Sequence, residues 1–327
     1  MKPFEEHFQA VIAKPVKDLN LEYTTFRETV TPGIDFRPYL NEDIVNQKYV
    51  QINVMDGFNP DHVSQMNNHS IYHLYEYEKK TGFISDIPAT NQFSGFYEMP
   101  TRFLLCRYVI CLLDDAMRKH APVELLAIRK NGVIYIGANK KLERIDDDRV
   151  MAAFGGLNFA KKVTTSIDPS FETHHSVVKE LRLENTVKRT AMTIFISSVV
   201  RAFDHKNNVI ELKTVKSNVA GKIQNLPGSK ARSWWLRALL SGADRIVYGL
   251  RRQDMVVHEV HEADINDLTT GHFHFDGNEL FEFVFHLFER IDNFIRGDGQ
   301  MCLVRPNEKG EIITPATSAD FNRSPFW

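Results

Sequence analysis

The segment "VRAFDHKNNVIELKTVK", from Val200 to Lys216, decides the fold because it places two strand-like runs around one polar turn, His205–Asn208. Apolar and polar residues alternate within the runs, as they do in strands with one buried face. Side chains two positions apart share a face of a strand, so Glu211 and Lys213 point the same way and Leu212 points into the core. The segment therefore predicts strands that display an acid and a lysine side by side.

The same segment has the composition of a metal-dependent phosphate site. Asp204 precedes Glu211 by seven residues, and two carboxylates can hold Mg²⁺ or Mn²⁺ because hard cations prefer oxygen ligands. Lys213 can stabilise phosphate charge or position a water. Many metal-dependent nucleases surround a scissile phosphate in this way. Charged hairpins on solvated surfaces contain such trios too, so the segment alone leaves both interpretations open.

The rest of the chain alternates expected helices with expected strand pairs. Helices are expected at residues 61–80, 100–119 with Pro100 at the start, 147–163 with a Gly-Gly interruption, 229–241 before Gly242, and 278–296 before Gly297. Strand pairs are expected at residues 123–138 around the turn signal Asn131-Gly132, and at 190–216, 245–260 and 300–312. This order predicts a mixed α/β (α+β) fold and not a doubly wound parallel sheet. We expect a single domain over residues 1–327, with an irregular segment at 1–45 and a C-terminal hairpin and tail at 300–327.

Composition limits the classes of function. The 327 residues include 40 Lys and Arg and 42 Asp and Glu, so the net charge is −2 and no overall positive field attracts nucleic acid. Three cysteines without a CxxC spacing suggest free thiols in a reducing compartment. Acids stand where a signal peptide has a basic flank, and no apolar run reaches the roughly 18 residues of a membrane span. The expectation is cytoplasm or nucleus, and no membrane partner.

Several short motifs recur in a family-specific order. The stretches "FLLCRYVICLL" (103–113), "AAFGGLNFAKK" (152–162) and "KARSWWLRALLSGAD" (230–244) flank the hairpin segment. In this order they resemble the DXO family of decapping and pyrophosphohydrolase exoribonucleases, also called the Dom-three or Rai family. The resemblance spans roughly residues 46–296. It implies one DXO-like domain built on two mixed, largely antiparallel sheets flanked by helices.

Part of the family's site agrees with this sequence. The resemblance assigns Arg107 to the arginine that contacts the RNA phosphate region. Asp204 matches the second acid of the family's Glu-x-Asp strand, and Glu211 with Lys213 matches its Glu-Leu-Lys strand. The resemblance implies that Asp204, Glu211 and Lys213 are remnants of a catalytic set.

The other part of the site is lost. Ala160 stands at the acid of the Gly-x-x-Phe-Glu motif, Ala202 at the first acid of Glu-x-Asp, and Arg237 at the glutamine of Trp-x-Gln-x-x-Leu-x-Gly. Affinity for divalent ions depends on the number and charge of ligands. The resemblance therefore implies no cofactor, with Mg²⁺ or Mn²⁺ only if an active enzyme remains. Asp204 and Glu211 are expected to face one pocket, which Arg237 would neutralise.

Cations near these motifs are the expected RNA contacts. Besides Arg107, Lys213 and Arg237, we expect Lys161 and Lys162 to contribute, within a wider basic cluster of Lys222, Lys230, Arg232, Arg245, Arg251 and Arg252. A solvated face explains the same cluster. The pair Trp234-Trp235 can stack on a base or pack in the core, and the histidines of residues 258–274 lack the HExxH order of a zinc site. The helix at 278–296 is apolar nearly all round, which indicates burial or a protein interface.

Three hypotheses for function follow from the resemblance. The first is a non-catalytic protein that binds RNA 5′ ends, a nuclear protein partner, or both, and that protects nascent transcripts from decapping, 5′–3′ decay or termination. The losses are similar to those of diverged members such as Cutoff, a germline protein of the piRNA pathway. The second is residual metal-dependent decapping, pyrophosphohydrolase or 5′–3′ exoribonuclease activity. The third is a protein-interaction scaffold. A nuclear location is expected, with the cytoplasm still open.

Overall fold

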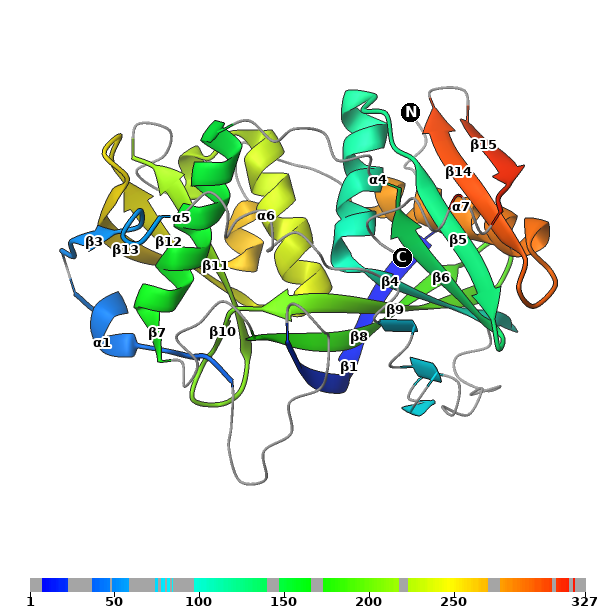
Figure 1. Cartoon of the computed structure of the whole chain (residues 1–327), viewed down its shortest axis with the longest axis horizontal. Coiled ribbons are helices and arrows are strands. Elements are labelled where there is room, and N and C mark those ends of the chain that lie inside the picture. Colours follow the sequence, from blue (N-terminus) through cyan, green and yellow to red (C-terminus); the bar gives the residue numbers. More distant parts are fainter. Residues whose placement is uncertain are drawn as a thin grey trace.

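The chain folds around two β-sheets. The computed structural model describes residues 8–22, 37–47, 49–58, 74–75, 78–79, 81–82, 84, 97–139, 147–165, 173–217, 223–269, 277–307, 310–317 and 320. The larger sheet has eight strands in the order β1-β8-β9-β4-β6-β5-β14-β15, and the smaller has seven in the order β3-β13-β12-β11-β10-β2-β7 (Figure 1). Neighbouring strands are antiparallel except for β9–β4, β4–β6, β11–β12 and β10–β2. The expected mixed, largely antiparallel architecture is confirmed.

The strands of the larger sheet come from both ends of the described chain. They are β1 (Phe8–Glu22), β4 (Tyr97–Cys106), β5 (Leu125–Lys130), β6 (Val133–Ala138), β8 (Thr173–Asn185), β9 (Thr190–Val200), β14 (Met301–Asn307) and β15 (Gly310–Pro315). The smaller sheet contains β2 (Tyr39–Leu40), β3 (Ile52–Asn53), β7 (Thr164–Thr165), β10 (Ala202–Phe203), β11 (Val209–Lys216), β12 (Arg245–Arg251) and β13 (Val256–Asp264). The chain passes from the larger sheet to the smaller one at Arg201, between β9 and β10.

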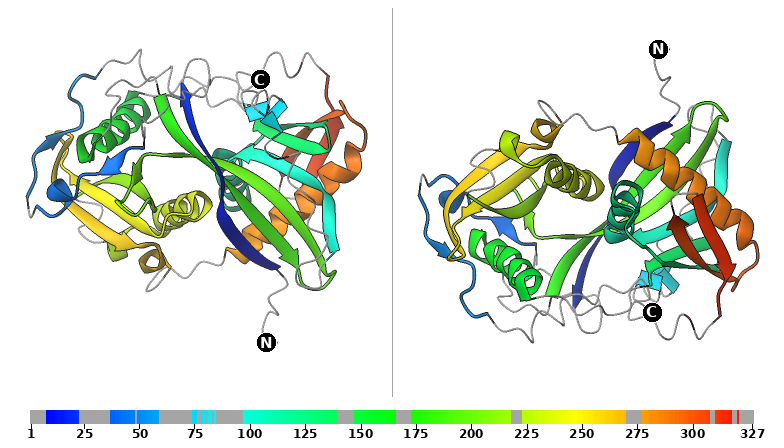
Figure 2. Two further views of the ribbon diagram at one scale, coloured as in Figure 1. Left: turned by 90° about the horizontal axis from the view of Figure 1, so that it is seen from below. Right: turned by 90° about the horizontal axis from the view of Figure 1, so that it is seen from above.

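The helices cover the sheets and join them. They are α1 (Glu42–Val45), α4 (Arg107–Lys119), α5 (Asp147–Val163), α6 (Gly228–Ser241) and α7 (Asn278–Phe294), with 3₁₀ turns η1 (Ile223–Asn225) and η2 (Ile265–Leu268). Helices α4 and α7 pack on one face of the larger sheet, and α5 packs on the smaller sheet (Figure 2). Helix α6 belongs to both cores: its Leu236 and Leu240 pack with the larger sheet, and its Trp234 and Ala238 pack with the smaller one.

Several local predictions are confirmed. Asn131 and Gly132 have φ values of 50° and 76°, as a two-residue type I′ turn between β5 and β6 requires. Helix α6 ends at Gly242, whose φ is 69°. All three cysteines are free thiols. Helix α7 is a core helix, because seven of its apolar side chains are buried. None of the helices in the described ranges is long and apolar enough to cross a membrane.

Three predictions are wrong. Residues 100–119 are not one helix, because β4 occupies the run up to Cys106. A short apolar run buried on both faces has no periodicity that separates strand from helix, and here Phe103 and Leu104 enter cores on opposite faces of the sheet. The N-terminal 45 residues are not irregular throughout, because β1 pairs with β8 along the sheet edge, where Pro15 is tolerated. Helix α5 is not interrupted by its glycines. A Cβ on Gly155 would come within 3.2 Å of Val54, so the glycine permits close packing.

The helix predicted at residues 61–80 lies for the most part outside the described residues, as do His272 and His274. His258 and His261 lie on β13, and within the described ranges no three His, Cys, Asp or Glu side chains gather as a metal site would require.

Candidate functional site

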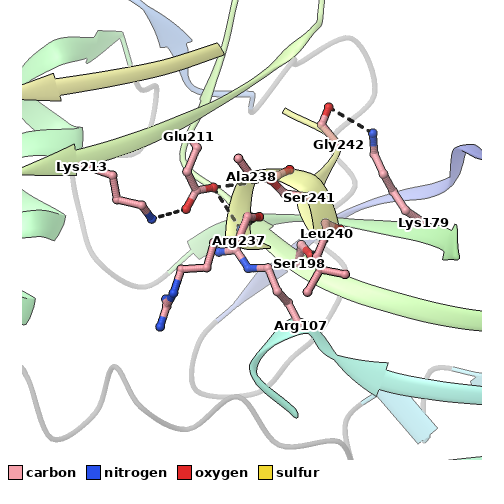
Figure 3. A network of polar contacts seen from close by, with 10 residues as sticks. All are labelled: Arg107, Lys179, Ser198, Glu211, Lys213, Arg237, Ala238, Leu240, Ser241 and Gly242. Atoms are coloured by element: carbon pink, nitrogen blue, oxygen red, sulfur yellow. Dashed lines mark hydrogen bonds and ion pairs between the residues drawn. The ribbon is translucent and has the colours of Figure 1, made fainter. Parts of the chain in front are cut away.

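Glu211 is the centre of the candidate site. It lies on β11, and its side chain retains 9% of its exposure while facing α4 and α6. Its Oε2 accepts a hydrogen bond of 3.0 Å from Nη1 of Arg107, and its Oε1 accepts one from Nζ of Lys213 (Figure 3). The hydroxyl of Ser241, at the end of α6, lies 3.5 Å from Oε2. We call Arg107, Glu211 and Lys213 the Glu211 clamp.

The fold brings these groups together from three elements. Arg107 is the first residue of α4, directly after β4 of the larger sheet. Its Nη1 also donates to the backbone oxygen of Arg237 at 2.9 Å, so one guanidinium joins α4, α6 and β11. Glu211 and Lys213 share one face of β11, as the spacing predicts, and Leu212 packs into the core on the other face.

The clamp has a strongly positive local field. Burial opposes ionisation of Glu211, but the charges of Arg107 and Lys213 outweigh burial and hold its pKa well below the usual value. Burial, and then the charges of Arg237 and Arg107, lower the pKa of Lys213 to about 8 even though Glu211 pulls it upward. Arg107 and Arg237 both act on Lys213, so three cations surround the single carboxylate of Glu211.

Arg237 does not replace a metal ion. Its side chain extends away from the Glu211 carboxylate (Figure 3), and among the described residues its guanidinium forms no ion pair with Asp204 or Glu211. The prediction that Arg237 neutralises the pocket is therefore wrong. Arg107 and Lys213 pair with Glu211 instead, because the backbone of α6 passes close to the carboxylate and the longer Arg237 side chain projects past it. Arg237 adds a further positive charge beside Lys213.

Asp204 does not share a pocket with Glu211, contrary to prediction. Its carboxylate accepts hydrogen bonds from the backbone N–H groups of Lys206 and Asn208, both at 2.8 Å, and from the Asn208 side chain at 2.9 Å. It therefore holds the turn between β10 and β11. Burial opposes the charge of Asp204, but these hydrogen bonds together outweigh burial and lower its pKa. A local turn has taken the carboxylate that the motif assigned to a metal site.

The strand register explains this difference. In the β10–β11 pair, Ala202 lies opposite Ile210 and Phe203 opposite Val209. Continued by one position, the register puts Arg201 opposite Glu211. Ala202 packs with Ile210 in the core beside α5, whereas Glu211 lies on the α6 face. The motif comparison assumes that Ala202 and Asp204 lie on the same face of the hairpin as Glu211. The register puts them on the opposite face, and it puts the cation Arg201 across from Glu211.

Ala160 is also part of an apolar core. It is buried on α5 beside Phe159, Val163 and Ile210. A methyl group offers no ligand, and a carboxylate there would need to be paired or hydrated. A divalent ion requires several oxygen ligands, whereas the clamp offers one carboxylate already hydrogen-bonded to two cations. The donor set fits an anion and does not fit Mg²⁺ or Mn²⁺.

The other predicted RNA contacts have varied positions. Lys162 pairs with Asp56 at 2.9 Å on the surface, and Lys161 lies beside it on α5, away from the α6 face. Arg245 pairs with Glu42 and Glu262. Lys222 lies outside the described residues. Trp234 is buried in the core, which excludes it from base stacking in this conformation.

A buried ion pair that sequence inspection missed joins α4 to α6. Nε of Arg232 donates to Oδ1 of Asp114 at 2.8 Å, and Nε of Arg118 donates to Oδ2 at 3.1 Å. Arg232 is thus a structural residue and not a phosphate contact. No local signal identifies the pair, because its members are 118 residues apart. Ser241 was missed too, although it is one helical turn after Arg237 and so shares its end of α6.

Comparison with known proteins identifies a matching family. A family model described as RAI1-like PD-(D/E)XK nuclease matches residues 103–320. Decapping nuclease dom-3 of Caenorhabditis elegans is 27% identical over 202 residues, which cover 54% of this chain and 49% of that protein. The chain thus matches about half the length of this curated relative.

Solved structures share the fold. Rai1 of S. pombe superposes with a TM-score of 0.66 at 14% identity, covering 96% of this chain and 97% of that one. Rai1 of Candida albicans, in complex with pU5-Mn²⁺, gives a TM-score of 0.65 at 9% identity, covering 96% and 92%. Dxo1 of K. lactis, in complex with manganese, gives 0.60 at 11% identity, covering 95% and 90%.

Proposed function

Because the chain belongs to the RAI1-like PD-(D/E)XK nuclease family, we propose that it is a non-catalytic member that binds phosphorylated RNA 5′ ends. The observation that carries this proposal is the Glu211 clamp. One buried carboxylate there is paired on both oxygens by Arg107 and Lys213, and Arg237 adds charge. A site with more cations than carboxylates attracts phosphate and repels a divalent cation.

The ligands of the relatives agree with this choice. Candida albicans Rai1 has been solved with pU5-Mn²⁺, and a mutant S. pombe Rai1 with three glutamates replaced has been solved with 3′-FADP. We propose that the phosphate-binding half of such a site persists here without the metal-binding half. Phosphate contacts depend little on base sequence, so a protein of this kind would select 5′ ends by charge and shape.

The wider role is part of the same proposal. We place the protein in the nucleus, with a nuclear protein partner, where it shields nascent transcripts from decapping, 5′–3′ decay or termination. Its incomplete ligand set supports a comparison with Cutoff-like members and hence with piRNA-pathway transcription. Microscopy of the tagged chain, and its recovery on nascent RNA after crosslinking, test the location and the shielding role.

The central test compares one RNA with a 5′-monophosphate and with a 5′-hydroxyl, bound in the presence of EDTA. We expect the phosphorylated RNA to bind about tenfold more tightly, the value of one charged hydrogen bond. Arg107→Gln should abolish that difference. Lys119→Gln is the matched control, because Lys119 is an exposed cation on the same helix, paired with Asp115. Equal affinity for both RNAs, or no binding at low salt, would favour the scaffold hypothesis.

The non-catalytic part of the proposal is tested with the same RNAs and a capped RNA in Mg²⁺ and in Mn²⁺. We expect no release of nucleotide or cap. Millimolar Mn²⁺ should leave the melting temperature unchanged, since an ion without affinity for the native state cannot stabilise it. Product release that Glu211→Ala abolishes would instead support the residual-enzyme hypothesis.

Affinity should also depend on pH through Lys213. Since its pKa in the folded protein is about 8, RNA affinity should fall as pH rises through that value and the ammonium loses its proton. Unfolded lysine keeps its proton to about pH 10, so the unfolded state binds more protons above pH 8 and stability should rise with pH. Lys213→Arg keeps its charge and should flatten both profiles. A wild-type profile parallel to that of Lys213→Arg would show that Lys213 does not contact the phosphate.

A further inference from the structure

A second group of cations lies at the opposite end of α6 from Ser241. Lys216 and Arg251 are the last residues of the parallel strands β11 and β12, and they lie opposite each other in the strand register. Lys230 is the third residue of α6 and lies within the electrostatic reach of both. We call Lys216, Lys230 and Arg251 the basic patch.

Within the part of the chain that the structure describes, the basic patch lacks acidic partners. Among the described residues, none of its three members forms an ion pair with a carboxylate, whereas Arg245 at the other end of β12 and Arg232 on α6 both do. Nη1 of Arg251 contacts the sulfur of Met255, while its Nε is buried and has no hydrogen-bond partner in the described ranges. Burial, together with the charges of Arg251 and Lys216, lowers the pKa of Lys230. Such mutual repulsion is relieved when an anion binds between the cations.

The first turn of α6 adds to this field. The helix begins at Gly228 after Pro227, and no side chain of the described residues caps it. Uncapped N–H groups give a helix N-terminus a partial positive charge that favours phosphate. The cations of the basic patch and the start of α6 thus both favour a bound anion.

We infer that the basic patch binds the sugar–phosphate backbone of the same RNA strand, downstream of the 5′ end held at the clamp. This inference rests on the proposed function for the identity of the polyanion. Lys216, five residues after Glu211, projects from the opposite face of β11, so the link between the two sites runs along α6. Lys230 and Arg237 are seven residues apart on that helix and share one face, about 10 Å apart at a rise of about 1.5 Å per residue. A single strand crosses that distance within the lower end of single-strand site sizes, roughly four nucleotides. An RNA strand that extends beyond the Glu211 clamp would also reach the basic patch.

The test separates the two sites by RNA length. A variant with Lys216→Gln, Lys230→Gln and Arg251→Gln is compared with wild type on a 5′-phosphorylated dinucleotide and on 5′-phosphorylated and 5′-hydroxyl strands of about 12 nucleotides. We expect the variant to bind the long strands about tenfold less tightly at low salt. Its slope of log K against log salt should be smaller by about two, since each single-strand contact contributes about 0.7. The dinucleotide should bind equally well to both proteins.

The matched control removes the same charge elsewhere. Lys119→Gln, Lys188→Gln and Arg296→Gln change three exposed cations on α4, the β8–β9 turn and the end of α7, and they should leave the salt slope unchanged. An unchanged slope in the basic-patch variant, or an equal change in the control, would overturn the inference. Competition by polyglutamate as effective as that of RNA would also overturn it, in favour of an acidic protein partner. The 5′-hydroxyl strand measures binding at the basic patch without a 5′ phosphate. The test therefore still decides the inference if the clamp does not distinguish the two RNA ends.

Discussion

Glu211→Gln tightens the binding of 5′-phosphorylated RNA while it destabilises the folded protein. The carboxylate competes with the phosphate for Arg107 and Lys213, so its neutral isostere leaves both cations available to the ligand. At about 4 Å and an effective dielectric constant of about 20, one charge interaction is worth up to about 4 kcal/mol. We therefore expect an affinity gain of at least about tenfold, or 1.4 kcal/mol. In a working metal nuclease the same change would remove a ligand and lower activity.

The cost appears in the free energy of unfolding. Removing one partner of a buried ion pair costs about 3–5 kcal/mol, because the other charge stays buried. Since the pKa of Glu211 is lowered in the folded state, its stabilisation is complete above the unfolded pKa of about 4.3 and is lost as pH falls below it. Acid unfolding of wild type should thus be steeper than that of Glu211→Gln.

The control for this substitution is Glu262→Gln, which removes the carboxylate of a more exposed ion pair with Arg245. It should change stability by at most about 1 kcal/mol and leave RNA affinity unchanged. Weaker binding of phosphorylated RNA by Glu211→Gln would contradict the idea that this carboxylate competes with the ligand.

Asp114→Ala is expected to cause the largest loss of stability without touching the clamp directly. The Asp114 and Arg232 side chains are only 3% and 7% exposed, so the substitution leaves a guanidinium buried without its carboxylate, at a cost of about 3–5 kcal/mol. Asp115→Ala is the neighbouring control, because Asp115 is 42% exposed in its pair with Lys119 and should cost at most about 1 kcal/mol. Denaturant unfolding of both variants measures the difference.

A double substitution distinguishes loss of charge from loss of packing. Asp114→Leu with Arg232→Met removes both charges while keeping apolar volume, and such replacements are often neutral or stabilising. Stability close to wild type in the double variant, with a large loss in Asp114→Ala, would identify the unpaired charge as the cause. If Asp114→Ala and Asp115→Ala unfold at the same denaturant concentration, the Asp114–Arg232 pair does not hold α4 to α6.

Sequence patterns predicted what local geometry determines. The two-residue period placed Glu211 beside Lys213, and Asn-Gly placed the turn between β5 and β6. Sequence patterns failed where contacts between distant parts of the chain determine the structure of the site. Arg107 and Glu211 are 104 residues apart, so their pairing depends on how α4 packs against the smaller sheet. Asp204 matched a motif by letter, but its own turn offered three donors within four residues.

The order of strands in the larger sheet has a consequence for biosynthesis. Its two edges are β1 and β15, the first and last strands described. Every strand of the smaller sheet lies between them in the sequence, from β2 to β13. During translation the smaller sheet can assemble before β14 has left the ribosome, but β5 keeps an unpaired edge until then. Such edges invite pairing with other chains. We therefore expect the edge of β5 to stay open to pairing with other chains until β14 emerges, after every strand of the smaller sheet has been made.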